Sequence, residues 1–93
     1  MNTEVETIVR SFRANIMSEL QCHRLIDGAG AVSAFKANVQ RHRERVLTKL
    51  EDMLSGIPSE TLESAATAIN DTADAVVARI EAAGRVEFAD GAL

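Results

Sequence analysis

Hydrophobic residues recur with helical spacing in the first quarter of the chain. From Val5 onward, apolar side chains return every three or four residues, the interval that places them on one face of an α-helix. The stretch "TEVE" at 3–6 has the spacing of a capping box, which marks a helix start, and "DGAG" at 27–30 breaks the pattern. We therefore predict a helix over residues 4–26. Its apolar face comprises Val5, Ile8, Val9, Phe12, Ile16, Leu20 and Ile26.

Two further segments carry the same periodicity. The second ends at "SGIP", where Gly56 can adopt the left-handed conformation that caps a helix and Pro58 prevents its continuation. The third opens at Pro58 or Ser59 and runs to Gly84. The pattern predicts helices over 31–55 and 59–83. The apolar face of the second helix comprises Val32, Phe35, Val39, Val46, Leu50, Met53 and Leu54.

The third predicted helix has the most regular apolar stripe in the chain. Its members alternate spacings of four and three residues through Ala83, which is the pattern of a coiled-coil seam. A strict seven-residue repeat predicts left-handed packing against a neighbouring helix at a shallow angle, and the small Ala side chains allow a close approach. We predict that this seam builds the core or a dimer contact. It comprises Leu62, Ala66, Ile69, Ala73, Val76 and Ile80.

Three helices of similar length with short connections favour an up-down-up bundle. An intertwined dimer of helical hairpins is the alternative, because a core with three Phe and neither Trp nor Tyr buries little area per residue. We predict an all-α fold with one helical domain over residues 1–84 and a short tail over 85–93, in which Phe88 docks. We also expect a homodimer.

Composition narrows the cellular setting. A single cysteine, Cys22, excludes an intramolecular disulfide framework and falls short of a cysteine-based zinc site, which favours a reducing compartment. The first residues are acidic where a secretory signal is basic, and no apolar run reaches the roughly 20 residues of a membrane span. We expect a cytoplasmic protein with no membrane partner.

Charge is divided unevenly along the chain. Residues 1–50 carry a net charge of +3 and residues 51–93 carry −7. Within the basic half, "KANVQRHRERVLTK" at 36–49 places Arg41, Arg45 and Lys49 in an i, i+4, i+8 row on the polar side of the second predicted helix. The two halves can neutralise each other in the fold, or the row can face an acidic partner.

Lys36 and Arg43 differ from this row because helical geometry points them toward the apolar stripe. Burying an unpaired charge is costly. We therefore expect Arg43 to extend its charged end to the edge of the stripe, to pair with a carboxylate on the third helix or with Glu19, or to anchor a partner among apolar neighbours, as in binding hot spots. The last alternative defines a candidate partner-binding set: Lys36, Val39, Arg41, Arg43, Arg45, Val46, Lys49 and Leu50.

The sequence offers little for catalysis or metal binding. His23 lies in the middle of the first apolar face, where we expect a neutral, hydrogen-bonded histidine. Its neighbour Cys22 points about 100° away, so the two cannot form a nucleophile–base pair. Glu19 precedes His23 by four residues, whereas the Glu-x-x-His motif of di-iron bundles spans three. We therefore predict no catalytic residues, no metal site and no cofactor.

These patterns favour a non-catalytic helical protein–protein interaction module. It would be an adaptor, inhibitor or assembly subunit that binds an acidic or apolar partner surface through its second helix. The alternative is a nucleic-acid-binding regulator that uses the same row together with Arg10, Arg13 and Arg24 of the first helix. The net charge of −4 and the lack of Trp and Tyr for stacking on bases disfavour this alternative.

Overall fold

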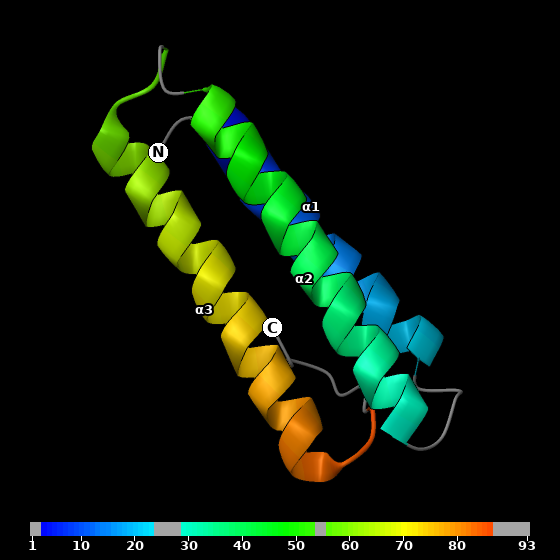
Figure 1. Ribbon diagram of the computed structural model, residues 1–93. Coiled ribbons are helices and arrows are strands. Elements are labelled where there is room, and N and C mark those ends of the chain that lie inside the picture. The colour runs from blue at the N-terminus through cyan, green and yellow to red at the C-terminus, as the bar shows by residue number, and fades with distance from the viewer. Residues whose placement is uncertain (1–2, 24–28, 54–55, 87–93) are drawn as a thin grey trace.

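The chain folds into three α-helices: α1 (Thr3–His23), α2 (Ala29–Asp52) and α3 (Ser59–Ala83) (Figure 1). The computed structural model describes residues 3–23, 29–53 and 56–86. The predicted all-α fold is confirmed. α2 begins two residues before its predicted start, because Gly30 in its first turn does not prevent helix formation. The predicted helix ends at residues 26 and 55 lie outside the described residues.

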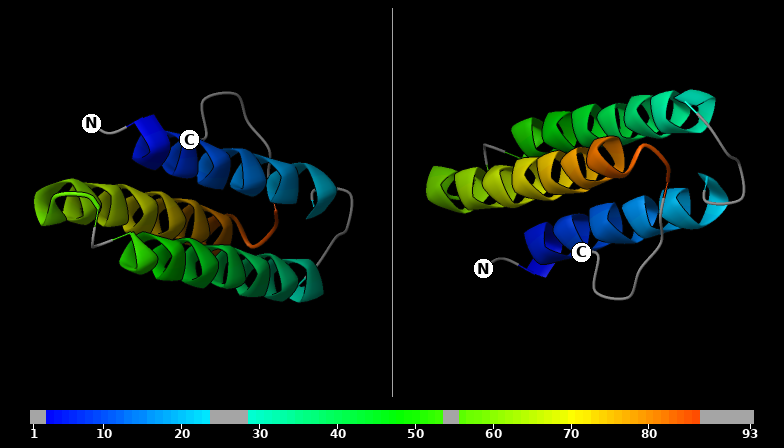
Figure 2. Two further views of the ribbon diagram at one scale, coloured as in Figure 1. Left: turned by 90° about the horizontal axis from the view of Figure 1, so that it is seen from above. Right: turned by 90° about the horizontal axis from the view of Figure 1, so that it is seen from below.

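The helices alternate in direction and pack side by side as an up-down-up bundle (Figures 1 and 2). Each helix contacts both of the others. The molecule measures 44 × 22 × 19 Å along its principal axes. The long dimension is close to the length of α3, about 37 Å at 1.5 Å per residue. Of the two predicted arrangements, the structure therefore has the single-chain bundle.

The three apolar faces meet along the axis of the bundle. Phe12 of α1 and Phe35 of α2 are fully buried and are the largest side chains of the core. Within the described ranges every buried residue is apolar, so the core contains no desolvated charge. None of the described helices combines the length and the apolar composition that crossing a bilayer requires. The core comprises Val5, Ile8, Phe12, Ile16, Leu20, Ala31, Phe35, Val39, Val46, Leu50, Ile57, Leu62, Ala65, Ile69, Ala73, Val76, Ile80 and Val86.

The seam predicted on the third helix lies in this core, but its strict heptad spacing is wrong at both ends. Ala65 is fully buried, Ala66 is only partly buried, and Ala83 is exposed. The buried positions follow the 3.6-residue period of a straight helix instead of the 3.5-residue period of a supercoil. The other seam residues, Leu62, Ile69, Ala73, Val76 and Ile80, are buried within one chain.

A second chain is therefore not needed to bury the seam. The predicted homodimer stays a prediction.

The two ends of α3 differ in their backbone conformation. Pro58 is the residue before the first turn of α3, with φ −56° and ψ 137°. Its ring fixes φ and its nitrogen has no hydrogen to donate, so a preceding helix cannot continue through it. Gly84 ends it with a φ of 71°, and its N–H donates to the carbonyl groups of Ile80 and Glu81. Gly56, for which a left-handed cap was predicted, has no positive φ; its N–H donates to the carbonyl of Met53 in a tight turn.

The start of the predicted tail belongs to the core. Val86 is buried, with an exposed fraction of 5%, so the ordered domain extends past Gly84. Phe88 lies outside the described residues.

Candidate functional site

The eight residues predicted to bind a partner fall into three groups. In the first group, Val39, Val46 and Leu50 belong to the core, with exposed fractions of 2%, 9% and 3%. These side chains stabilise the bundle, and each exposes less than a tenth of its surface. The predicted anchor, with Arg43 set among accessible apolar neighbours, is therefore not formed.

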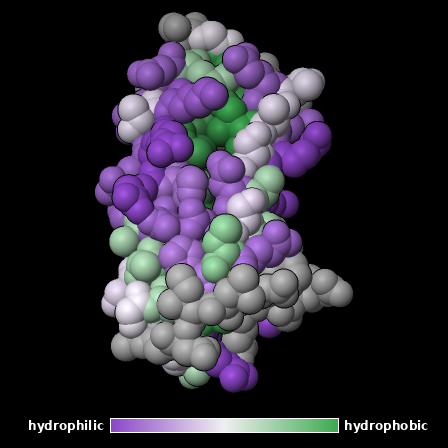
Figure 3. Space-filling model, turned by 90° about the vertical axis from the view of Figure 1, so that its right-hand side faces the viewer, coloured by the Kyte–Doolittle hydropathy of each residue, from purple (hydrophilic) through white to green (hydrophobic). Residues whose placement is uncertain are grey.

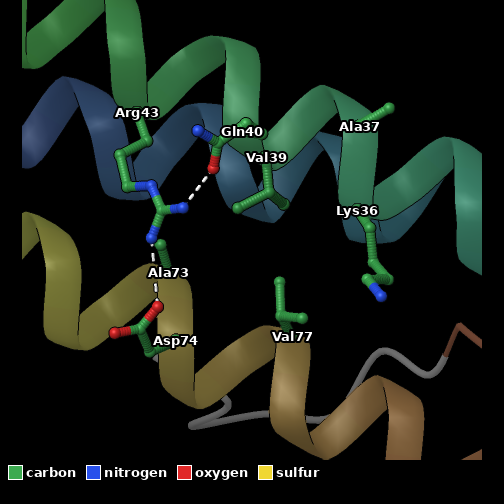
Figure 4. Close-up of a pocket in the computed structure, with 8 residues that line it drawn as sticks. All are labelled: Lys36, Ala37, Val39, Gln40, Arg43, Ala73, Asp74 and Val77. Carbon is green, nitrogen blue, oxygen red and sulfur yellow. Dashed lines mark hydrogen bonds and ion pairs between the residues drawn. The ribbon is translucent and has the colours of Figure 1, made fainter.

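The second group pairs with acids of α3. Arg43 Nη1 lies 3.0 Å from Asp74 Oδ1, and the same guanidinium donates to the Gln40 side chain (Figure 4). Lys36 Nζ lies 3.4 Å from Glu81 Oε1. Both pairs link α2 to α3, so part of the charge asymmetry between the two halves of the chain is neutralised within the fold. Because both pairs are solvent-exposed, each contributes little to stability.

The third group is the row Arg41, Arg45 and Lys49, which we call the basic row. All three side chains are exposed. None of them forms an ion pair with another residue of the described ranges. The fold therefore neutralises the cations of α2 that face α3 and leaves these three to solvent.

The basic row borders the groove between α1 and α2. Arg45 and Lys49 line a hollow of about 180 Å³ with the polar side chains of Thr7, Ser11 and Asn15. Its floor is apolar and consists of Ile8, Phe12 and Val46. Figure 3 shows this face of the molecule, with hydrophobic surface at the bottom of a hollow that hydrophilic side chains surround.

A second hollow, of about 250 Å³, continues the groove. Arg45 lines both hollows and is joined here by Arg41. The other lining residues are Glu19, Asn38 and His42. The basic row therefore follows the groove over two turns of α2.

A polar cluster connects α1 to α2 beside this second hollow. Its centre is the carboxylate of Glu19, which accepts hydrogen bonds from Asn38 Nδ2 at 2.9 Å and from His42 Nε2 at 3.1 Å. The third donor is His23 Nε2, at 3.0 Å, one helical turn along α1. Since a carboxylate oxygen only accepts, this hydrogen bond requires the proton of His23 on Nε2, and the Asn38 N–H₂ group, 3.2 Å from the same nitrogen, then cannot donate to it.

The surroundings of His23 agree with this tautomer. Its Nδ1 is buried without a hydrogen-bond partner among the described atoms, and its ring meets Phe35 edge-on with centroids 6.0 Å apart. An unprotonated Nδ1 is the less costly group to leave unpaired there, since a buried N–H donor without an acceptor loses a full hydrogen bond. His23 is hydrogen-bonded, as predicted, but it lies at the edge of the core instead of within it, since its side chain is 11% exposed.

The cluster changes the ionisation of Glu19. Burial alone would raise the pKa of this carboxyl, but the hydrogen bonds from Asn38, His42 and His23 lower the pKa below its ordinary value of 4.5. The folded protein therefore stabilises the ionised carboxylate.

Sequence reasoning named Glu19 and His23 but did not predict that they meet Asn38 and His42. Two pairs at i, i+4 spacing were the available signal: Glu19 with His23, and Asn38 with His42. Each pair lies on one side of its helix. The contact between the pairs depends on how far α1 is shifted along α2, and no local pattern encodes that register.

The other reactive groups are not assembled into a site. Cys22 is exposed and contributes nothing to the cluster. In the part of the chain that the structure describes, no group of three or more His, Cys, Asp and Glu side chains is arranged to hold a metal ion.

The arginines of α1 lie on the other side of that helix from the basic row. Arg10 and Arg13 line a hollow of about 280 Å³ between α1 and α3, together with Glu6, Val9 and Ala68. The row faces the groove between α1 and α2 instead. The structure therefore does not join these basic residues into one surface. Arg24 lies outside the described residues.

Comparison with protein-family models, curated proteins and solved structures gave no match for this chain.

Proposed function

We propose that this protein is a non-catalytic interaction module that binds an acidic segment of another protein in the groove between α1 and α2. The observation that carries the proposal is the basic row: three exposed cations on one side of α2 that have no ion pair with the described part of the chain. Such a module acts by occupying a surface, as an adaptor, inhibitor or assembly subunit does.

The groove offers the other contacts that a peptide needs. Thr7, Ser11 and Asn15 recur every four residues along its α1 side and supply neutral hydrogen-bonding groups. Ile8 and Val46 form part of an apolar floor. An acidic segment with one apolar side chain would place its carboxylates against the basic row and that side chain over the floor. Charge complementarity of this kind contributes specificity and association rate more than affinity.

Nucleic acid is the less favoured partner. A duplex-binding protein gathers many cations on one face, whereas here Arg10 and Arg13 lie across α1 from the basic row. Phe12 and Phe35 are fully buried, so neither can stack on a base. Three cations beside an apolar floor suit a peptide better than a phosphate backbone.

Matched charge reversals test the proposal. The row variant Arg41→Glu/Arg45→Glu/Lys49→Glu removes the basic row. The control variant Arg10→Glu/Arg13→Glu/Arg79→Glu changes the net charge equally at exposed positions outside the groove. Tagged wild type and both variants would be used to capture partners from source-cell lysate, with and without nuclease, and far-UV circular dichroism would confirm that each variant folds.

We expect at least one protein that wild type and the control variant retain in the presence of nuclease and that the row variant loses. Equal capture by all three proteins would refute the proposed role of the basic row. Loss of capture on nuclease treatment would instead establish the nucleic-acid alternative.

A further inference from the structure

The groove between α2 and α3 contains a hollow with an apolar floor. Carboxylates border this hollow, whereas Arg45 and Lys49 border the hollow over Ile8, Phe12 and Val46 in the α1–α2 groove. The volume of the α2–α3 hollow is about 330 Å³, and its floor includes Leu47, Leu62 and Ala66. One carboxylate borders it from each helix, Glu51 from α2 and Glu63 from α3. This hollow lies on the opposite side of α2 from the basic row, so the proposed function does not account for it.

Among the described residues that line this groove, the charged groups are paired outside that hollow and unpaired beside it. Moving along α2 from its start, Lys36 pairs with Glu81 and Arg43 pairs with Asp74. Glu51 and Glu63 come next. Both are exposed, and neither forms an ion pair with another residue of the described ranges.

Between the two paired positions lies a further apolar hollow, of about 300 Å³. Val39, Ala73 and Val77 line it, with the Arg43–Asp74 pair at one end (Figure 4). The centres of the two hollows are separated by some ten residues of α2, or about 15 Å at 1.5 Å per residue. A helix laid along the groove would therefore reach both hollows with side chains about three turns apart.

We propose that the α2–α3 groove docks a cationic amphipathic helix of a partner protein. A Lys or Arg side chain of that helix lays its aliphatic stem over Leu47, Leu62 and Ala66 and places its charged end between Glu51 and Glu63. Long cationic side chains have this division into an apolar stem and a polar end. An apolar side chain of the same helix, about three turns away, enters the hollow over Val39, Ala73 and Val77.

The carboxylates decide in favour of a cationic partner over a second copy of this chain. If two copies packed through this groove, Glu51 and Glu63 of one copy would face either the same acids of the other copy or its Lys36 and Arg43, which already have acidic partners. A cationic helix would neutralise Glu51 and Glu63 instead. With the basic row on its other side, α2 would carry two docking surfaces of opposite charge, as an adaptor requires.

Two model helices would test this inference and the proposed function separately. Each would have about 18 residues, roughly 27 Å of helix, enough to cover both hollows. One would be built from Leu and Lys, and the other from Leu and Glu. Binding would be followed at physiological salt by amide chemical shifts of the isotopically labelled protein and by fluorescence anisotropy of the labelled peptide.

Three variants would locate the Leu/Lys helix. Glu51→Gln/Glu63→Gln removes the two carboxylates, and Glu6→Gln/Asp71→Asn removes the same charge from exposed positions elsewhere. Ala66→Leu fills the hollow without changing charge. We expect the Leu/Lys helix to shift amides of α2 and α3 around the hollow, with Kd raised about five- to tenfold by the first variant and tenfold or more by Ala66→Leu, but less than twofold by the control.

Several results would overturn the inference. If both charge variants weakened binding of the Leu/Lys helix equally, the helix would be attracted by the net negative charge of the protein and not by Glu51 and Glu63. Shifts spread over all acidic residues, or no binding, would mean that the groove docks no cationic helix. Concentration-dependent shifts in the groove without peptide would mean that a second copy occupies it. Shifts in the α1–α2 groove with the Leu/Glu helix test the proposed function independently, so either idea can fail alone.

Discussion

Replacing Glu19 by Gln tests the physical account of the polar cluster between α1 and α2. The substitution keeps the size of the side chain and removes its charge. It leaves one acceptor oxygen where the carboxylate has two, and puts an N–H₂ group where the other oxygen was. Depending on which oxygen is replaced, either His42 or both Asn38 and His23 then face a donor instead of an acceptor.

The size of the effect follows from the three hydrogen bonds, of 2.9, 3.0 and 3.1 Å. A hydrogen bond to a charged group contributes about 1.5–3 kcal/mol. Gln retains at least one of the three bonds, and because the Glu19 side chain is 20% exposed, water replaces part of what is lost. We expect the free energy of unfolding near neutral pH to fall by about 1–2 kcal/mol. For a domain of this size, that lowers Tm by about 4–15 °C.

The effect depends on pH in a defined direction. The pKa of Glu19 is lower in the folded protein than its ordinary value of 4.5, so folding favours the ionised form. Its contribution is therefore complete above the ordinary pKa and is lost as the pH falls through the lower pKa of the folded state. Since Gln does not titrate, the difference in stability between wild type and Glu19→Gln should be largest above about pH 5 and shrink below about pH 4.

Urea denaturation followed by far-UV circular dichroism measures this difference, because the chain has no Trp or Tyr for fluorescence. Wild type and Glu19→Gln would be compared at constant ionic strength from pH 3.5 to 7, with Glu63→Gln, at an exposed acid, as the control. A loss for Glu19→Gln that is the same at pH 3.5 as at pH 6, or no larger than that of the control, would refute the role assigned to the carboxylate.

Three further predictions concern the helix contacts. Arg43→Ala should lower the free energy of unfolding by less than about 1 kcal/mol, since its pair with Asp74 is exposed; a loss above 2 kcal/mol in urea denaturation would contradict this. Gly84→Ala should cost about 1 kcal/mol, because φ is 71° and Ala is strained there, and an unchanged Tm would be the contrary result. Ala65→Leu should lower the free energy of unfolding by about 1–3 kcal/mol by overpacking the core, whereas Ala66→Leu should change it by no more than about 0.5 kcal/mol. A larger loss for Ala66→Leu than for Ala65→Leu would show that Ala66 is the core position, as the heptad spacing predicted.

Local signals were enough to predict the three helices. The break at "DGAG" and the Pro58 boundary depend on backbone chemistry that a few residues determine. The choice between Ala65 and Ala66 is not local. Both are small, and both fit a helical stripe that starts at Leu62. Only the packing of α3 against two neighbours in one chain, instead of a supercoil with one, places Ala65 inside.

The candidate site was predictable in part for a similar reason. The i, i+4 spacing was sufficient to place Arg41, Arg45 and Lys49 on one exposed row. The pairing of Arg43 with an acid of the third helix was one of several alternatives, and Asp74 could not be chosen among those acids without the register of α2 against α3. The hollows have no sequence signature, because each is lined by two helices.

The polar cluster also explains why the basic row remains unpaired. Arg43 and Arg45 are two residues apart and point to opposite sides of α2, where they meet different neighbours. Asp74 of α3 pairs with Arg43. Among the α1 residues that line a hollow with Arg45, Glu19 is charged and the others are uncharged. Glu19 lines the same hollow as Arg41 and Arg45, but its two oxygens are already held by Asn38, His23 and His42. A carboxylate that is hydrogen-bonded in this way gains little from turning to an exposed arginine. Arg41, Arg45 and Lys49 therefore remain without an ion pair in the described part of the chain.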